Sequence, residues 1–515
     1  MVLKSPHADV TIPDGNLAAV TLARAAEFGD RPALVDGPSG RTITFAELDR
    51  LVKGLAAGLA ERGLKKGDVV GIFSPNLPEY AVAFHGIATA GGVVTTVNPT
   101  STAEELARQL KAAKATRLIT APPFLATAKE AAAEVGIEEV VVFGEAEGAT
   151  AFASLFGDPA KAPEVAIDAA NDLVALPFSS GTTGLPKGVM LTHRNLVANV
   201  AQAKAALAVK DGSVAMGVLP FFHIYGMTVI MNLALSEGST VVTMPRFDLP
   251  LFLELHQKHG VTHSFVVPPI VLALAKHPLV EKFDLSSIEI LMSGAAPLSP
   301  ELAEAAAARL GCTVLQGYGL TETSPVTHCN SPENNQPGSI GVLSPLTEAR
   351  IVDPETGADA PEGERGELWI RGPQVMKGYL DNPEATAHMI DADGWLHTGD
   401  VATVDDGGYF RIVDRLKELI KYKGFQVPPA ELEAILLQHP QIADAAVIGR
   451  PDDEAGEIPV GFVVTDLDAD AVKKHVADQV SHYKQLRDVK IVESIPKSAS
   501  GKILRRVLAE QDRAG

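Results

Sequence analysis

Short β-branched runs alternate with helical hydrophobic patterns through the first third of the chain. The predicted elements are, in order, a strand at 69–73, a helix from Pro78, a strand at 93–97, a helix opened by Ser101 or Thr102, a strand at 118–120, a helix after Pro123 and a strand at 140–142. Thr102 and Glu105 have the spacing of a capping box, which supports a helix start there. Strands that alternate with helices favour an α/β fold with parallel strands.

The same alternation returns in the middle of the chain. A predicted strand leads into the Gly-rich segment 293–297, and a helix is expected from Pro300 to the residue before Gly311, both favoured at those helix ends. The next strand, at 313–315, runs into a second Gly-rich segment at 316–322. If the two strands pair in parallel, both segments lie at one carboxyl edge of a sheet, where open α/β folds bind ligands.

The pattern changes beyond residue 400. A helix is predicted at 430–437 after a Pro-Pro pair, with short strands at 445–448 and 460–464 and a helix at 469–483. This arrangement indicates a compact α+β unit of roughly 100 residues, an ordinary domain size.

A charged segment, Asp414 to Glu418, precedes that unit and favours a structured hinge over a flexible Gly/Ser linker. The expected organisation is a large N-terminal domain at 1–414, made of α/β subdomains with mostly parallel sheets. A hinge at 415–418 and a small, mobile α+β domain at 419–515 follow it.

Composition and charge exclude several function classes. The 515 residues exceed one ordinary domain, so two to four units are expected. The formal charge of −20 repels phosphate backbones and disfavours a nucleic-acid-binding role. Two cysteines, Cys312 and Cys329, are too few for a disulfide framework and lack metal-ligand spacing, which favours a reducing compartment.

No segment has the length and apolar character of a membrane span. The best candidate, 80–97, is interrupted by His85 and a Gly-Gly pair, and the N-terminus lacks the basic and apolar regions of a signal peptide. We expect a cytoplasmic protein without stable membrane association, either a monomer or a homodimer.

The strongest local signal for chemistry is the segment 179–188, Ser-Ser-Gly-Thr-Thr-Gly-Leu-Pro-Lys-Gly, directly after an apolar run. Its small residues supply backbone N–H groups and hydroxyls that can surround a polyphosphate, and Lys187 adds a cation. Pro186 stands where a Walker A loop needs its second glycine, so the segment is not a Walker A loop. Taken alone, such a segment is more often a surface turn.

The chain resembles the adenylate-forming acyl-CoA synthetases from end to end, with closest similarity to the 4-coumarate:CoA ligases. The resemblance rests on motifs in family order: 179–188, Phe222-His223-Ile224-Tyr225, 293–298, Gly317-Tyr318-Gly319-Leu320-Thr321-Glu322, His397-Thr398-Gly399-Asp400, Asp414 to Lys417 leading to 421–424, and 496–502. Any one of these motifs could occur by chance, but the whole set in order could not plausibly do so.

The resemblance implies a two-step ligase reaction. A carboxylate attacks the α-phosphate of ATP to give an acyl-adenylate and pyrophosphate, and coenzyme A then displaces AMP to give a thioester. Negative charge accumulates on the phosphates in the first step, so fixed donors, lysine cations and Mg²⁺ should supply most of the catalysis. The implied substrates and cofactors are ATP, Mg²⁺, coenzyme A and a small carboxylic acid.

The resemblance also assigns the ATP site. Asp400 is expected to accept hydrogen bonds from both ribose hydroxyls, with Arg415 as a second contact. Glu322 is the expected Mg²⁺ ligand and Thr183 a weaker candidate, and carboxylate oxygen is a ligand type that Mg²⁺ prefers. The other expected ATP or AMP contacts are Ser179, Ser180, Gly181, Thr182, Thr183, Gly184, Lys187, Ala296, Pro297, Gln316, Gly317, Tyr318, Thr321 and Lys502.

Four residues are expected to serve catalysis and the exchange between the two steps. Lys502 would bridge the substrate carboxylate and the α-phosphate, while Lys417 marks the hinge about which the small domain rotates after adenylation. Lys421 would act in the thioester-forming state, in which the expected coenzyme A contacts are Arg246, Lys423, Gly424 and Gln426. His223 matches a family histidine beside the acyl pocket, although a lone histidine between apolar residues is more often a core residue.

The acyl pocket is expected to suit a flat ring. Its residues, by resemblance, are Ile224, Tyr225, Thr228, Gly294, Ala295, Gly317, Gly319, Pro325 and Val326. No carboxylate lies between Phe222 and Ile230, where amino-acid-activating relatives place an aspartate, so an amino-acid substrate is disfavoured. A hydroxycinnamate, a phenylpropanoid acid such as 4-coumarate, is the expected substrate.

Two alternatives stay open at this point. Thr228, Phe265, Met292 and Thr327 depart from the commonest plant pattern, and a medium- or long-chain fatty acid is the alternative substrate. A non-catalytic nucleotide-binding regulatory protein is the alternative from another class, although such a protein needs neither Glu322 nor Lys502.

Overall fold

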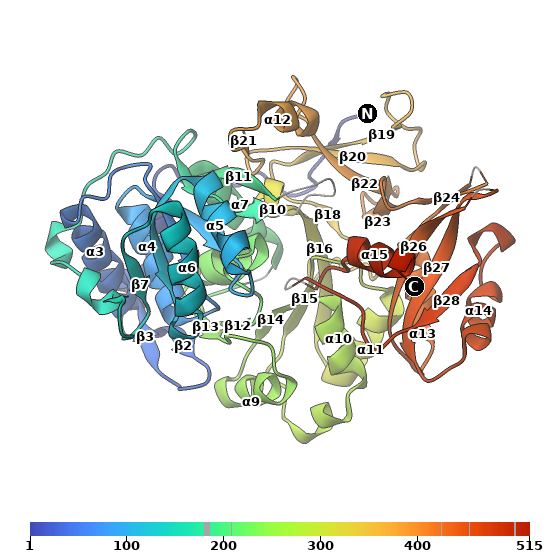
Figure 1. Cartoon of the computed structure of the whole chain (residues 1–515), viewed down its shortest axis with the longest axis horizontal. Helices are drawn as coiled ribbons and strands as arrows, with labels where there is room; N and C mark the ends of the chain where they lie inside the picture. Colours follow the sequence, from blue (N-terminus) through green and yellow to red (C-terminus); the bar gives the residue numbers. More distant parts are fainter. Residues whose placement is uncertain (180–185, 208, 424, 453, 499–500, 515) are drawn as a thin grey trace.

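The described strands form four sheets, and helices cover two of them in the large N-terminal part of the chain (Figure 1). The computed structural model describes residues 1–179, 186–207, 209–423, 425–452, 454–498 and 501–514. A smaller C-terminal part with its own sheet lies to one side of the molecule (Figure 1). The predicted division into a large α/β domain of mostly parallel sheets and a small C-terminal domain is confirmed.

The first sheet contains the alternating elements predicted between residues 69 and 142. Its strands lie in the order β10 (Phe178–Ser179), β11 (Lys187–Thr192), β9 (Leu173–Ala175), β5 (Val93–Val97), β4 (Val69–Phe73), β6 (Ala115–Thr120), β7 (Val140–Val142) and β8 (Thr150–Ala151), and β21 (Gly378–Tyr379) pairs with β11. The connecting helices are α3 (Phe45–Glu61), α4 (Pro78–Thr89), α5 (Ala103–Ala113) and α6 (Leu125–Val135). The predicted capping box is confirmed, because Thr102 and Glu105 cap the start of α5 reciprocally.

The second sheet carries both Gly-rich segments. Its strands lie in the order β18 (Val342–Leu343), β17 (Val326–Cys329), β16 (Thr313–Gly319), β15 (Ile290–Ser293), β14 (His263–Val266), β12 (Val214–Gly217), β13 (Thr240–Thr243), β2 (Pro32–Asp36) and β3 (Thr42–Thr44). The expected parallel pairing of β15 with β16 is confirmed. Strand β16 is longer than predicted and continues through Gly317 to Gly319, because β17 pairs with it on its other side.

Six helices lie in and around the second sheet, and one of them, α11, was predicted from the sequence. They are α7 (His193–Leu207), α8 (Ala234–Ser236), α9 (Leu249–His259), α10 (Pro268–Lys276), α11 (Pro300–Leu310) and the π-helix η4 (Gly226–Leu233). Helix α11 begins at Pro300 as predicted, and Gly311 ends it in the left-handed conformation. Shorter helices are α1 (Leu17–Thr21), α2 (Ala25–Phe28) and α12 (Pro383–Met389).

A third, antiparallel sheet connects the large domain to the C-terminal part. Its strands lie in the order β1 (Leu3–Lys4), β19 (Glu348–Val352), β20 (Gly366–Arg371), β22 (Leu396–Val404) and β23 (Phe410–Arg415). Strand β23 ends at Arg415, and a hydrogen-bonded turn follows, in which the N–H groups of Glu418 and Leu419 donate to the Arg415 carbonyl. The segment expected to act as a hinge is thus an ordered turn at the end of a strand.

The C-terminal domain has a separate core behind its own sheet. The strands lie in the order β25 (Phe425–Val427), β24 (Ile420–Tyr422), β27 (Gly456–Thr465) and β26 (Ile442–Asp452), with β28 (Asp488–Ile491) on β27. The helices are α13 (Pro429–Gln438), α14 (Ala469–Ala477) and α15 (Arg505–Ala514). Leu432, Leu436, Val447 and Val463 are fully buried in its core.

One predicted helix of this domain was wrong in length. The helix expected at 469–483 ends at Ala477, and a 3₁₀ turn at His482–Lys484 follows it. The chain has to turn there to enter β28, and Arg487 holds the turn by donating to the His482 carbonyl at 2.7 Å. Strands β26 and β27 are both longer than predicted because they pair along nearly their whole length.

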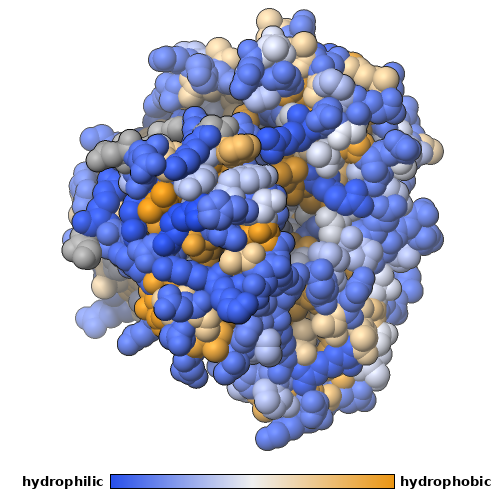
Figure 2. Space-filling view, turned by 90° about the vertical axis from the view of Figure 1, so that its right-hand side faces the viewer, coloured by the Kyte–Doolittle hydropathy of each residue, from blue (hydrophilic) through white to orange (hydrophobic). Residues whose placement is uncertain are grey.

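The surface of the described residues offers no broad apolar area on the C-terminal side. Figure 2 shows this face, on which hydrophilic residues predominate and apolar residues form small separated patches. None of the helices in the described ranges is long and apolar enough to cross a membrane.

The core of the large domain encloses an ionisable side chain without a partner. His85 on α4 has no exposed surface, and neither ring nitrogen has a hydrogen-bond partner among the described residues. Burial lowers the pKa of His85 to about 3, so the ring is neutral in the folded protein. Since the unfolded chain binds this proton near pH 6.5, His85 destabilises the fold progressively as the pH falls from 6.5 toward 3.

Replacing His85 with Phe should therefore flatten the pH dependence of stability. Between pH 7 and pH 5 the variant should lose about 2 kcal/mol less unfolding free energy than the parent, as measured by urea unfolding. His388→Phe, at an exposed position, is the matched control and should leave the slope unchanged. Equal slopes for His85→Phe and the parent would show that His85 is not buried in the neutral form.

Candidate active site

The two Gly-rich segments lie side by side and are joined by one buried amide. Gln316 accepts a hydrogen bond from the Leu298 backbone N–H at 2.6 Å and donates to the Ser339 carbonyl at 3.0 Å. The side chain thus ties the 293–298 turn to β16. Among the residues expected to contact adenine, Ala296 and Gly317 are half-buried and Pro297 is exposed.

Three polar side chains, Tyr318, Asp400 and Arg415, form a chain of contacts centred on the buried Asp400. The Tyr318 hydroxyl donates to Asp400 Oδ2, and Arg415 Nε lies 3.2 Å from Asp400 Oδ1. Burial raises the pKa of Asp400 above its ordinary value, although the Arg415 guanidinium and the Tyr318 hydroxyl oppose this shift. The β22–β23 pairing places Asp400 directly opposite Arg415, so two neighbouring strands hold the carboxylate and its cation.

Glu322 is a buried carboxylate, and only one of its two oxygens accepts hydrogen bonds from the described residues. It is 5% exposed, and its Oε1 accepts hydrogen bonds from Ser179 Oγ at 2.9 Å and from Tyr379 Oη at 2.8 Å. Its Oε2 has no hydrogen-bond partner among the described residues. Lys187 lies over the Tyr379 ring at 5.1 Å, so the two ends of the 179–188 segment both reach this carboxylate region.

Most of the 179–188 segment lies outside the described residues. Ser180, Gly181, Thr182, Thr183 and Gly184, all expected phosphate contacts, belong to this part of the chain. Ser179, Lys187 and Thr321 are described, and all three are half-buried. The described ends of the segment therefore lie close to Glu322. The expected role of Thr183 as a metal ligand stays a prediction.

Lys502 comes to this edge from the C-terminal domain. Gly501 packs on the large domain, where a Cβ at that position would lie 3.1 Å from Val267 Cγ2. Loss of hydration lowers the pKa of Lys502, and the Arg415 guanidinium adds to this shift, whereas Asp400 and Glu322 oppose it. The Lys502 side chain is exposed, and its ammonium group forms no ion pair shorter than 4 Å with the described residues.

Among the expected acyl-pocket residues, Tyr225 and Gly294 lie against each other. The Tyr225 hydroxyl donates to the Met292 carbonyl at 3.1 Å, and its ring meets Phe265 edge-on. A Cβ at position 294 would lie 2.9 Å from the Tyr225 ring, so this position requires glycine. A Cβ at position 317 would lie 2.6 Å from the flexible end of Met292 and 3.1 Å from the His328 carbonyl oxygen, so space is tight there as well. The remaining members of the set, Ile224, Thr228, Gly319, Pro325, Val326 and Ala295, are buried or half-buried.

His223 lies near the approach of Lys502. Its Nδ1 accepts a hydrogen bond from the Tyr225 N–H at 3.3 Å. Burial lowers the pKa of His223 to about 4, and the Lys502 ammonium adds to the effect, which indicates that the two groups are neighbours. The imidazole is neutral at physiological pH.

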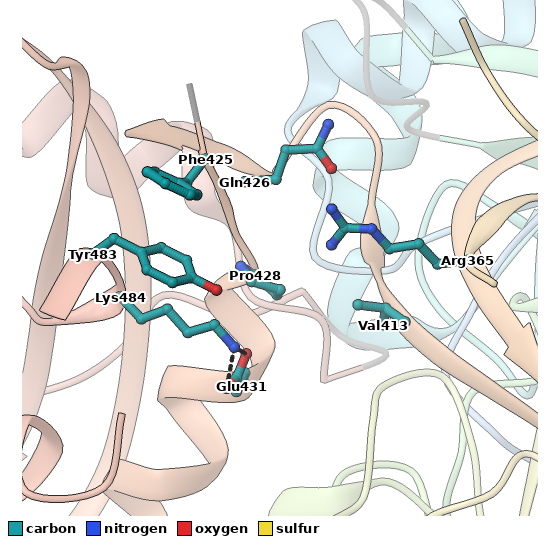
Figure 3. A pocket seen from close by; sticks show the side chains of 8 residues that line it. All are labelled: Arg365, Val413, Phe425, Gln426, Pro428, Glu431, Tyr483 and Lys484. Carbon is teal, nitrogen blue, oxygen red and sulfur yellow. Dashed lines mark hydrogen bonds and ion pairs between the residues drawn. The ribbon is translucent and has the colours of Figure 1, made fainter. Parts of the chain in front are cut away.

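The described residues expected to contact coenzyme A, Arg246, Lys423 and Gln426, are all exposed, and Gly424 lies outside the described residues. Lys417, the expected hinge residue, and Lys421 are exposed as well. Lys423 pairs with Glu454 at 3.1 Å. Gln426 lines a pocket of about 310 Å³ between the two domains, together with Arg365, Phe425 and Tyr483 (Figure 3). None of the residues expected at the ATP site lines this pocket.

Two contributors to the site were missed from the sequence. Tyr379, which holds Glu322, lies far along the chain and reaches the site because β21 pairs with β11. Ser339 fixes the Gln316 amide through its backbone carbonyl, a role that no side-chain pattern reveals. No local signal marks either residue.

Comparison with protein families gives two matches. Residues 22–380 match the AMP-binding enzyme family, and residues 431–502 match the AMP-binding enzyme C-terminal domain. The chain is 46% identical to 4-coumarate–CoA ligase 5 of Oryza sativa subsp. japonica, a match that covers 100% of this chain and 98% of the relative. It is 45% identical to 4-coumarate–CoA ligase 1 of Solanum tuberosum, with 100% and 97% covered.

Solved structures give the same fold. The anthranilate CoA ligase AuaEII in complex with anthranoyl-AMP has a TM-score of 0.90 at 26% identity, covering 97% of this chain and 98% of that one. ATP-bound MatB from Rhodopseudomonas palustris has a TM-score of 0.86 at 30% identity, covering 96% and 99%. Both likenesses include both domains of the present chain.

Removing the Tyr318–Asp400 hydrogen bond tests the expected contact of Asp400 with the ribose. Tyr318→Phe removes the donor that orients Asp400, so the KM for ATP should rise about fivefold to tenfold while kcat changes little. Steady-state kinetics with varied ATP measures the effect. Tyr409→Phe, which removes an exposed tyrosine hydroxyl that donates to the Asn334 carbonyl, is the matched control. An unchanged KM in Tyr318→Phe would contradict the assignment.

Proposed function

We propose a substrate and residue roles for this chain, which belongs to the AMP-binding enzyme family and is an ATP-using, AMP-forming CoA ligase of the 4-coumarate–CoA ligase type. The proposed substrate is a hydroxycinnamate such as 4-coumarate. The observation that carries the proposal is the buried Tyr225 ring between Phe265 and Gly294, which suits stacking of a flat aryl acid. Relatives about 45% identical over their whole length act, by their names, on 4-coumarate.

A buried hydroxyl next to Tyr225 supports a polar ring substituent. Thr228 Oγ1 is fully buried and has no hydrogen-bond partner among the described residues. An unsatisfied buried hydroxyl costs free energy that a phenolic hydroxyl of the substrate could offset by hydrogen bonding. An alkyl chain offers no such partner, so the pocket favours an aryl acid over a fatty acid.

In the proposed first step, a carboxylate oxygen of the acid attacks the α-phosphorus of ATP. The bond between the α-phosphorus and the bridging oxygen breaks, and pyrophosphate leaves. Lys502 neutralises the carboxylate and α-phosphate as they approach, while Asp400 holds the ribose hydroxyls and neutral His223 borders the acyl pocket. These groups are fixed before reaction, so they stabilise developing charge without reorganising.

Glu322 has the chemistry to hold a divalent cation. Among the described residues, hydrogen bonds reach only Oε1, so Oε2 is available to a cation. The described residues contain no group of three His, Cys, Asp or Glu side chains that could hold a metal, so phosphate and water oxygens would complete the shell. Mg²⁺ bound there supplies charge neutralisation on the phosphates.

In the proposed second step, the coenzyme A thiolate attacks the acyl carbon. The bond from that carbon to the phosphate oxygen breaks, and AMP leaves. Lys421, Lys423 and Gln426 are exposed, and none of the residues expected at the ATP site lines the pocket that contains Gln426, which supports a rotation of the C-terminal domain between the steps. We propose the 415–418 turn as the hinge, a cytoplasmic location, and a monomer or homodimer.

The rotation predicts opposite defects for two lysine variants. Lys502→Ala should reduce adenylation more than about a hundredfold and leave thioester formation from synthetic acyl-adenylate nearly intact. Lys417→Pro should do the reverse, because the Lys417 N–H has no acceptor in the described structure and proline restricts the dihedral that must rotate. ATP–pyrophosphate exchange and thioester assays measure the two steps. Equal losses of both steps in both variants would contradict domain alternation.

The substrate proposal predicts a strong preference within a panel of acids. The kcat/KM for coenzyme A-dependent AMP release, measured with ATP and Mg²⁺, should be at least about tenfold higher for 4-coumarate than for octanoate or palmitate. Preference for octanoate or palmitate would overturn the assignment of the pocket around Tyr225. The ligase reaction itself would remain.

A further inference from the structure

Asp414, just before the proposed hinge, uses both carboxylate oxygens in contacts to backbone N–H groups. The side chain is 5% exposed. Its Oδ1 accepts from the adjacent Arg415 N–H at 2.7 Å, and its Oδ2 accepts from the Ala430 N–H at 3.2 Å. Asp414 lies in β23 of the large domain, whereas Ala430 lies in the first turn of α13 in the C-terminal domain. The second contact therefore crosses the domain boundary.

The start of α13 needs an acceptor that its own sequence does not provide. Pro428 is the N-cap residue and makes no side-chain cap, and Pro429 occupies the first helical position. Neither proline has an N–H, so Ala430 carries the first free amide hydrogen of the helix. Asp414 supplies a negatively charged cap at the positive end of the helix, from outside the domain.

Helix α13 in turn holds the segment that carries Lys502. Glu433 on α13 is 8% exposed and pairs with the Arg505 guanidinium through both of its oxygens, at 2.9 and 3.1 Å. Arg505 Nε also lies 2.9 Å from Glu418 in the hinge turn. Because Arg505 is the first residue of α15 and follows Lys502 by three residues, its ion pairs fix the direction in which the chain runs from Lys502 into α15.

We propose that Asp414 is a positioning residue for the adenylation step, which caps α13 across the domain boundary and thereby holds Lys502 over the ATP site. The proposal rests on the domain alternation described above. Asp414 and Ala430 lie on opposite sides of the 415–418 hinge, so rotation separates them and the cap stabilises only the adenylating orientation.

The half-reactions of Asp414 variants test this role. Asp414→Ala should lower carboxylate-dependent ATP–pyrophosphate exchange about fivefold to tenfold, the loss expected for one helix cap. Thioester formation from synthetic acyl-adenylate should be unchanged or faster. Asp414→Asn, which retains one acceptor oxygen, should show a smaller split in the same direction. Circular dichroism melting establishes that each variant is folded at the assay temperature.

The matched control removes a buried carboxylate that does not cross the boundary. Glu237, 8% exposed, pairs with Lys204 inside the large domain at 2.9 Å. Glu237→Gln should change both half-reactions by the same factor. Equal changes of both steps in Asp414→Ala, or a split below about twofold, would overturn the proposal. Failure of the proposed function itself is distinguishable, because the parent protein would then lack carboxylate-dependent exchange.

The pH dependence of the exchange rate distinguishes a positioning role of the Asp414 carboxylate from a merely structural role. Burial raises the pKa of Asp414 to about 6, and the charged groups that act on it are Arg505 and Glu418. These two pair with each other, and Glu433 and Arg415 pair with Arg505 and Glu418 in turn. As the pH falls through 6, the carboxylate gains a proton and loses one acceptor. The ratio of parent to Asp414→Asn exchange rates should therefore approach one below pH 6. A ratio that stays constant from pH 5 to pH 8 would contradict the role of the carboxylate.

Discussion

The arrangement of the site depends on the attraction between Lys502 of the C-terminal domain and two carboxylates of the large domain, Asp400 and Glu322. Asp400 and Glu322 are buried in the large domain, and both raise the pKa of Lys502, which the C-terminal domain brings to them. Loss of hydration and the Arg415 guanidinium act in the opposite direction and lower the pKa overall. Lys502 forms no ion pair shorter than 4 Å with the described residues, so its ammonium group is available to an anionic ligand.

The large domain contributes rigidity to this arrangement. Parallel pairing of β15 with β16 brings the two Gly-rich segments to the same edge, and the Gln316 amide joins them. Glycine at 294 lets the Tyr225 ring approach the backbone more closely than a side chain at that position would permit. The residues proposed for the acyl and nucleotide sites thus lie on adjacent turns of one sheet, while Lys502 comes from the C-terminal domain.

Local signals in the sequence predicted much of the fold, and distant contacts account for the rest. The Thr102–Glu105 cap, the ends of α11 and the parallel β15–β16 pair follow from residues close in the chain. The helix expected to reach Tyr483 stops at Ala477, because the path into β28 overrides the helical pattern. Tyr379 and the Asp414–Ala430 contact could not be predicted, since strand pairing and domain packing alone bring these groups together. The expected roles of Asp400, Glu322 and Lys502 came from family motifs, and periodicity in the chain carries no information about them.

The central claim is that one site serves two reactions because the C-terminal domain takes two orientations. Fluorescent labels on Thr356→Cys and Ser481→Cys, both exposed and one on each domain, would report the orientation by energy transfer. Competing labelling is slow, because burial raises the pKa of Cys312 to about 11 and that of Cys329 further. Energy transfer should have one value with ATP alone and shift to a second value when acyl-adenylate and coenzyme A are bound. A single value under both conditions would contradict the account.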